Sequence, residues 1–265
     1  MVKIAHECPN ALFKQVQLIT DYDYCLIHKL DEDIDYQSKF MEAVSLGREV
    51  ILDNSIFELG EAYDQEAYRW WIRHLEPTYY IIPDVLNNAE GTTHNLKEWR
   101  KDVFGIDHIK SIGVIQGNTF EELVLCYESI APSVNKVAIP FDSNSFQYFH
   151  PNKWASMALG RAMFVFYLIK KYGKELKPLH LLGCANPVFE LHQYKNTDAM
   201  SYIDSIDTSS PIVHGMNNIK YDTFYRGDWQ KITSLVSESL DWTPSVEQVG
   251  IITGNIMEFR KMLHG

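Results

Sequence analysis

Short runs of apolar and β-branched residues alternate along this chain with longer segments in which apolar residues recur at helical spacing. This alternation is typical of α/β folds, in which each strand of a parallel sheet is followed by a helix. The runs that predict strands are Tyr24–His28, Glu49–Asp53, Tyr79–Asp84, Ser111–Gln116, Lys136–Phe141, Pro178–Cys184, Ser201–Asp207 and Gln248–Thr253.

The segments between and after these runs have the apolar spacing of helices that bury one face. Two carry start signals: Thr119 stands three residues before Glu122, and Asn186 directly precedes Pro187. Residues 1–20 and the segment His214–Arg226 show no regular pattern. The predicted helices are Tyr36–Leu46, Asp64–Leu75, Ala89–Phe104, Thr119–Ile130, Asn152–Tyr172, Pro187–Tyr194, Asp228–Leu240 and Asn255–Leu263.

Eight strands, each followed by a helix, in a chain of 265 residues predict a (β/α)8 TIM barrel. No linker or repeat divides the sequence, so we expect a single domain over residues 1–265. A doubly wound open sheet is the alternative, but it usually needs fewer strands and often has a glycine-rich turn after its first strand, which is absent here.

Composition narrows the class of protein. The chain is 46% hydrophobic, and its longest apolar run, Ala162–Ile169, is too short to span a bilayer. The opening residues have no apolar stretch of signal-peptide length, so we expect a cytoplasmic protein without membrane partners. The net charge of −11 argues against broad attraction to nucleic acid, although it leaves local contacts open. The cysteines are scattered, which favours reduced thiols over disulfides or a zinc knuckle: Cys8, Cys25, Cys126 and Cys184.

Four predicted strands end on a polar residue, namely Asp53, Asp84, Gln116 and Asp207. In a barrel, the carboxyl ends of the strands carry the active site. For any one of them, capping of the next turn is at least an even alternative, but four converging residues weaken that interpretation. Carboxylates in such a set suit acid–base work, attack on a sugar carbon, or binding of the N–H groups of a base. No histidine ends these strands, so a metal site ranks lower, and we expect no metal and no cofactor.

Five segments in this order carry a resemblance to a known family: 52–57 (LDNSIF), 82–84 (IPD), 113–118 (GVIQGN), 180–183 (HLLG) and 203–211 (IDSIDTSSP). The set resembles the motifs of the tRNA-guanine transglycosylase family. It is most similar to the small DNA 7-deazaguanine transglycosylases of phages and bacterial modification islands.

The resemblance implies a reaction and two catalytic residues. Asp207 would be the nucleophile that attacks the sugar C1′ and holds a covalent glycosyl intermediate while guanine leaves. Asp53 would be the general acid/base that assists departure of the old base and takes a proton from the new one. Asp204 lies three residues before Asp207, on the opposite face of the strand, and is expected to be a supporting or structural carboxylate.

The same resemblance implies the residues that bind the base. Asp84 and Gln116 would bind the guanine edge, the carboxylate accepting from N–H groups and the amide facing the carbonyl. Phe57 would stack on the ring, and Gly117 and Gly183 would contact the substrate. The target nucleotide must be extruded or single-stranded to be reached.

The sequence departs from the tRNA-acting members in three places. No cysteine follows Asp207, so the zinc-binding subdomain is expected to be missing. Residues 138–141 (AIPF) replace a Gly-Leu-Ala turn, and residues 214–217 (HGMN) replace an arginine-rich turn. These differences favour DNA over tRNA as partner, with a 7-deazaguanine base as the second substrate, and a location in the host cytoplasm if the protein is phage-encoded.

Two other functions stay open at this point. The acidic charge is compatible with a glycosylase or base-exchange enzyme that acts on free nucleosides or nucleotides. A non-catalytic base-binding barrel would keep Asp84 and Gln116 without a working nucleophile. Oligomeric state is not indicated by the sequence.

Overall fold

Eight parallel strands form one sheet in the computed structural model, which describes residues 1–102, 108–184, 186–221 and 242–264. Their order in the sheet is β1-β8-β7-β6-β5-β4-β3-β2, so each strand from β2 to β8 neighbours the next one along the chain, and β1 pairs with β8. This is the (β/α)8 TIM-barrel fold that the sequence predicts. The strands are β1 (Lys3–Ala5), β2 (Asp23–Leu26), β3 (Val50–Asp53), β4 (Tyr79–Ile81), β5 (Lys110–Val114), β6 (Lys136–Pro140), β7 (Leu179–Leu182) and β8 (Ile203–Asp207).

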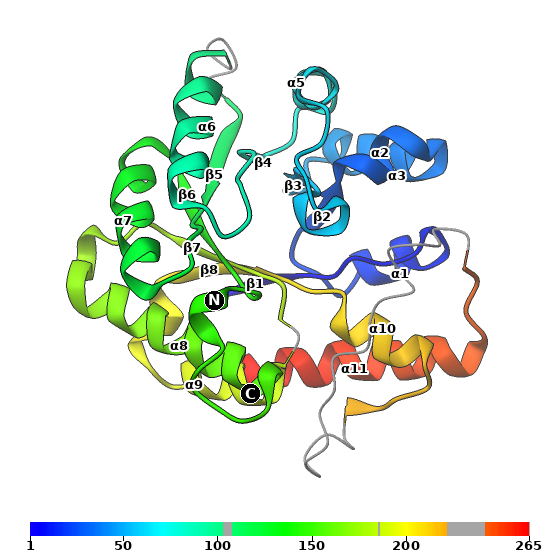
Figure 1. Cartoon of the computed structure of the whole chain (residues 1–265). Helices are drawn as coiled ribbons and strands as arrows, with labels where there is room; N and C mark the ends of the chain where they lie inside the picture. The colour runs from blue at the N-terminus through cyan, green and yellow to red at the C-terminus, as the bar shows by residue number, and fades with distance from the viewer. Residues whose placement is uncertain (103–107, 185, 222–241, 265) are drawn as a thin grey trace. The chain divides into compact units, whose positions relative to one another are not determined.

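Helices are interleaved with the strands from the amino to the carboxyl end of the chain (Figure 1). Short 3-10 turns connect several of them. The α-helices are α1 (Phe13–Gln17), α2 (Ile27–Glu32), α3 (Ile34–Ser45), α4 (Ile56–Leu59), α5 (Gln65–Leu75), α6 (Ala89–Asp102), α7 (Phe120–Ile130), α8 (Lys153–Tyr172), α9 (Pro187–Tyr194), α10 (Ser210–Met216) and α11 (Val246–His264).

The residues divide into two compact units, which are described separately below. The first, here called the Asp207 unit, comprises Met1–Asp21, Phe146–Leu176 and Leu181–Gly265. The second, here called the Asp84 unit, comprises Tyr22–Ser145 and Lys177–His180.

The predicted helix starts are confirmed. The Thr119 side chain accepts the backbone N–H of Glu122, and the Asn186 side chain accepts that of Phe189. These caps satisfy amide donors that have no partner inside the first turn of a helix.

The prediction of a strand at Gln248–Thr253 is wrong, because these residues lie in helix α11. The local run of Val249, Ile251, Ile252 and Thr253 favours a strand, since β-branched residues have a high strand propensity. Over a longer window, however, the buried residues of α11 recur every three or four positions, as on one face of a helix. They are Ile251, Ile252, Asn255, Ile256, Phe259, Met262 and Leu263.

The expectation of irregular structure is wrong at several places, and one of them is helix α1 within residues 1–20. Strand β1 pairs with β8 in the register Ala5↔Asp207, although three residues are too short to show a strand pattern in sequence. Helix α10 extends through His214 to Met216, inside the segment His214–Arg226. The predicted helix Asp228–Leu240 lies outside the described residues.

Helix α10 packs closely on α11 in the Asp207 unit. A Cβ atom at Gly215 would lie 2.3 Å from the Ile252 side chain, so only glycine fits there. Asn255 of α11 donates to the carbonyls of Pro211 and Ile219 and accepts the N–H of Tyr221. Helix α11 therefore supports the segment that follows β8. Its part Gln248–Thr253 was predicted as a strand, whereas the prediction of a helix at Asn255–Leu263 is confirmed. None of the described helices is long and apolar enough to cross a membrane.

Candidate active site

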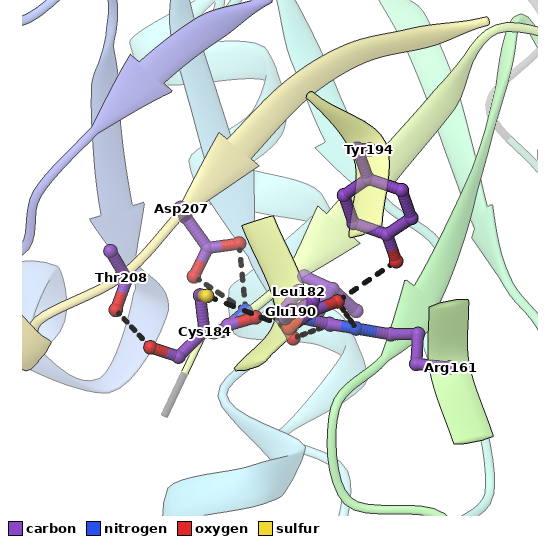
Figure 2. Close-up of polar contacts among 8 residues, drawn as sticks. Arg161, Leu182, Cys184, Glu190, Tyr194, Asp207 and Thr208 are labelled. Atoms are coloured by element: carbon purple, nitrogen blue, oxygen red, sulfur yellow. Dashed lines mark hydrogen bonds and ion pairs between the residues drawn. The ribbon is translucent and has the colours of Figure 1, made fainter. Parts of the chain in front are cut away.

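Asp207 is the last residue of β8, as predicted, and its side chain is buried in the Asp207 unit. The backbone N–H of Gly183 faces both of its carboxylate oxygens, with N···O distances of 3.3 and 3.2 Å (Figure 2). Gly183 follows β7 and has φ of +64°, a left-handed conformation that glycine adopts without steric cost. The nucleophile candidate therefore has a backbone donor that a glycine presents to it.

A buried arginine holds the carbonyl groups on either side of this donor. The Arg161 guanidinium, from α8, donates to the carbonyl of Leu182 at 2.7 Å and to that of Gly183 at 2.5 Å. It also forms a two-point ion pair with Glu190 of α9, with N···O distances of 2.6 and 2.7 Å. Both side chains of this pair are 0% exposed. Burial opposes the charge on Arg161, but the charge and hydrogen bonds of Glu190 raise the pKa of the guanidinium, which stays protonated.

Neutral donors complete the environment of Glu190 (Figure 2). The Tyr194 hydroxyl lies 3.0 Å and the Cys184 thiol 3.5 Å from its carboxylate oxygens. Burial raises the pKa of Cys184 and of Tyr194 well above their ordinary values, so both keep their protons. The ion pair is thus embedded in a hydrogen-bonded group, which offsets the cost of burying two charges.

The turn after Asp207 is fixed to its neighbours by Thr208. The Thr208 hydroxyl donates to the carbonyl of Cys184 at 3.3 Å, and His6 Nδ1 lies 2.8 Å from the carbonyl of Thr208. Burial lowers the pKa of His6 to about 4, so the ring is neutral at pH 7. Nδ1 then donates to Thr208, which leaves Nε2 as a buried acceptor without a hydrogen-bond partner among the described residues.

Asp53 ends β3 in the Asp84 unit, again as predicted. One of its oxygens accepts the Tyr24 hydroxyl at 2.5 Å, and the other accepts the backbone N–H of Ser55 at 2.5 Å. Tyr24 lies on the neighbouring strand β2 and stacks on the ring of His180, with centroids 6.0 Å apart. These contacts orient the Asp53 carboxylate. The Tyr24 ring also packs on the buried ring of His180.

Asp84 and Gln116 lie in contact in the same unit, although β4 and β5 end two or three residues before them. Gln116 Nε2 donates to one oxygen of Asp84 at 2.6 Å, and Asn54 Nδ2 donates to the other at 2.9 Å. Gln116 Oε1 accepts the backbone N–H of Asn87 at 2.9 Å, which fixes the orientation of the amide. Burial raises the pKa of Asp84, and the two amide hydrogen bonds counteract part of that shift.

The other two predicted base-binding residues of this unit differ in exposure. The Phe57 side chain, on α4, is 58% exposed. Gly117 is buried against α7, where a Cβ atom would lie 2.8 Å from that of Glu122. A glycine is therefore required at 117 for packing alone, and the substrate contacts of both residues stay predictions. Asp204 is half-buried whereas Asp207 is buried, as expected for opposite faces of β8.

Several residues of the site have no clear signal in the sequence. Tyr24 and Asn54 contact the carboxylates of Asp53 and Asp84, but neither belongs to a strand-end set. Arg161 and Glu190 are separated by 29 positions in sequence. A lone arginine within the apolar pattern of α8 is the one sign that it has a buried partner.

Neither the known protein-family models nor the curated proteins contain a match to this chain. Within the described ranges, no group of three or more His, Cys, Asp or Glu side chains is placed to hold a metal ion. The chemistry available is that of carboxylates, amides and backbone donors. Such groups can act as nucleophile, proton carrier and receptor for a donor-rich ring edge.

Proposed function

We propose that this chain is a guanine transglycosylase of nucleic acid, which exchanges guanine for a 7-deazaguanine base such as 7-cyano-7-deazaguanine. DNA is the favoured polymer over tRNA. The observation that carries the proposal is the buried pair of Asp84 and Gln116, whose donors and acceptors fit one edge of guanine.

That edge presents two N–H donors beside a carbonyl acceptor. Each oxygen of Asp84 accepts one amide hydrogen bond and can accept another, because a carboxylate has about four lone-pair sites. Gln116 uses one N–H on Asp84 and has a second N–H for the carbonyl of the base. A base without these donors would leave a buried carboxylate incompletely paired, which is a strong basis for discrimination. Guanine and a 7-deazaguanine share this edge, so one receptor serves the leaving and the incoming base.

The reaction proceeds by two displacements at C1′. A carboxylate oxygen of Asp207 forms a bond to C1′ as the C1′–N9 bond breaks, and Asp53, which enters this step as the protonated acid, gives its proton to the departing guanine. Asp53 then takes the N9 proton of the incoming 7-deazaguanine. The base attacks C1′, and the Asp207 carboxylate is released. Two inversions retain the original configuration, and both carboxyl groups return to their starting protonation states.

Base exchange with labelled 7-cyano-7-deazaguanine tests this proposal. We expect label in guanine-containing single-stranded DNA and release of one free guanine for each base incorporated. Asp207→Asn and Asp84→Asn should both abolish incorporation, whereas Asp204→Asn, on the opposite face of β8, should retain it. Absence of label from DNA, tRNA and mononucleotides alike would contradict the proposal. Label in mononucleotides alone would show that the substrate is not a polymer.

A further inference from the structure

We infer that Arg161 is a positioning residue for Asp207, acting through the peptide group that joins Leu182 to Gly183. The inference rests on the proposed function and adds to it a residue outside the resemblance. All the contacts that carry it lie within the Asp207 unit (Figure 2).

The geometry follows from the planarity of that peptide group. Its carbonyl, belonging to Leu182, accepts from Arg161 at 2.7 Å, and its N–H, belonging to Gly183, faces the two oxygens of Asp207. In a trans peptide these two bonds point in opposite directions. The guanidinium and the carboxylate therefore lie at the two ends of one rigid hydrogen-bonded unit.

The positive charge also acts on the strength of the donor. Hydrogen bonds in a chain polarise one another, so a cation on the carbonyl oxygen makes the N–H of the same peptide a better donor. Arg161 holds the next carbonyl as well, at 2.5 Å from Gly183 O, which prevents the left-handed glycine from turning its N–H away. Glu190 in turn keeps Arg161 in place and charged.

The consequence differs between the two displacements. During the first, the carboxylate loses charge as it bonds to C1′, so the N–H mainly aims the attacking oxygen. During the second, the carboxylate regains its charge as it leaves, and a polarised N–H stabilises it. Loss of Arg161 should therefore slow transfer of the sugar to the incoming base more than formation of the Asp207 adduct.

Arg161→Lys tests the inference, because lysine lacks the planar fork that reaches Glu190 and both carbonyls at once. An ammonium that pairs with Glu190 leaves the Leu182 carbonyl without its cation. We expect sugar transfer from the enzyme to labelled 7-cyano-7-deazaguanine to slow by about ten- to a hundred-fold, as for other residues that orient a catalytic group. The KM for the base should change little. The adduct should be a larger fraction of the enzyme at steady state than in the wild type.

Rates are expressed per active molecule, counted as the end-point amount of adduct with DNA alone. Arg48→Lys is the matched control: it changes an arginine that pairs with Asp23 in the other unit, and should leave both steps at wild-type rate. Where Arg161→Lys yields no folded protein, Glu190→Gln replaces it, with the same order of effects and a smaller size.

The outcomes separate the inference from the proposed function. A wild-type enzyme that forms no adduct and exchanges no base overturns both. A wild-type enzyme that exchanges base, together with an Arg161→Lys enzyme of unchanged rates per active molecule, overturns the inference alone. Equal slowing of both displacements also overturns the proposed polarisation of the Gly183 N–H by Arg161. It would show that the variant only disturbs the position of Asp207.

Discussion

Asp207 and Asp84 are both buried aspartates, one at the last position of β8 and the other three residues after β4, yet their partners differ in kind. Asp207 faces the backbone N–H of Gly183, and the buried, charged Arg161 donates to the carbonyl of the same peptide group. Asp84 accepts from the neutral side-chain amides of Asn54 and Gln116, and burial raises its pKa. The environment of Asp207 fits a carboxylate whose charge changes during a reaction. The environment of Asp84 fits a receptor whose hydrogen bonds are completed by the donors of a ligand.

The largest effect on stability is expected from Arg161→Met. The substitution leaves the Glu190 carboxylate, which is 0% exposed, without its cation, and uncompensated buried charges of this kind cost about 3–5 kcal/mol. Urea unfolding monitored by circular dichroism would measure the loss. Arg48→Met removes a partly exposed partner of the buried Asp23 and should cost less, about 1–3 kcal/mol. Similar losses for the two variants would show that the Arg161–Glu190 ion pair contributes no more to stability than the Arg48–Asp23 pair.

The pH dependence of stability should reveal the neutral His6 beside Asp207. Burial lowers the pKa of His6 from 6.5 to about 4. Between these two pH values His6 is therefore protonated in the unfolded chain but stays neutral in the folded chain. The His6 contribution is therefore present above pH 6.5 and is lost as the pH falls towards 4, by about 3 kcal/mol for a shift of this size.

His6→Asn serves as the comparison, since its amide can still donate to the Thr208 carbonyl but does not titrate. The free energy of unfolding of the variant should fall less steeply between pH 6.5 and pH 4 than that of the wild type. Parallel curves for the two proteins would show that His6 is not buried in its neutral form.

On the Asp84 side, Asn54→Ala should have a smaller effect than Arg161→Met. It removes one donor to Asp84 and the acceptor for the N–H of Ile56, and a buried group left unpaired costs about 1–3 kcal/mol. Asn118→Ala, at an exposed position in the same unit, is the control and should cost less. Chemical denaturation of both variants at pH 7 makes the comparison. A larger loss for Asn118→Ala would contradict the described network.

The smallest effect is expected for Gly183→Ala, which retains the backbone donor to Asp207 but adds a Cβ atom at φ of +64°. A left-handed residue other than glycine costs about 1–2 kcal/mol. Gly250→Ala, in an open part of α11, should instead be neutral or stabilising by about 1 kcal/mol. Thermal melts of the two variants should shift in opposite directions or differ clearly in size. Equal shifts would argue against the strained conformation.

The ends of β3 and β8 were accessible from the sequence because both strands are short, largely apolar runs that stop at an aspartate. That pattern placed Asp53 and Asp207 at the last positions of β3 and β8. It failed at Gln248–Thr253 of α11, where a local run of β-branched residues predicts a strand and the helical period shows only over a longer window. It also missed β1, whose three residues are defined by pairing with β8 and not by their own pattern.

The supporting residues were harder to predict for a physical reason. The contacts of Tyr24 with Asp53 and of Arg161 with Glu190 depend on strand register and helix packing, which a single sequence does not contain. The Asp84–Gln116 contact is a similar case. Both residues were singled out separately, but only the fold shows that the amide donates to the carboxylate.

The most direct test of the central claim is to identify the residue that carries the sugar. The wild-type protein would be incubated with guanine-containing single-stranded DNA, denatured, digested and analysed by mass spectrometry. We predict a DNA-derived sugar on the peptide that contains Asp207, absent from Asp207→Asn and discharged when 7-cyano-7-deazaguanine is added before denaturation. Base exchange without any adduct, or an adduct on Asp53 in place of Asp207, would contradict the assignment of Asp207 as the nucleophile.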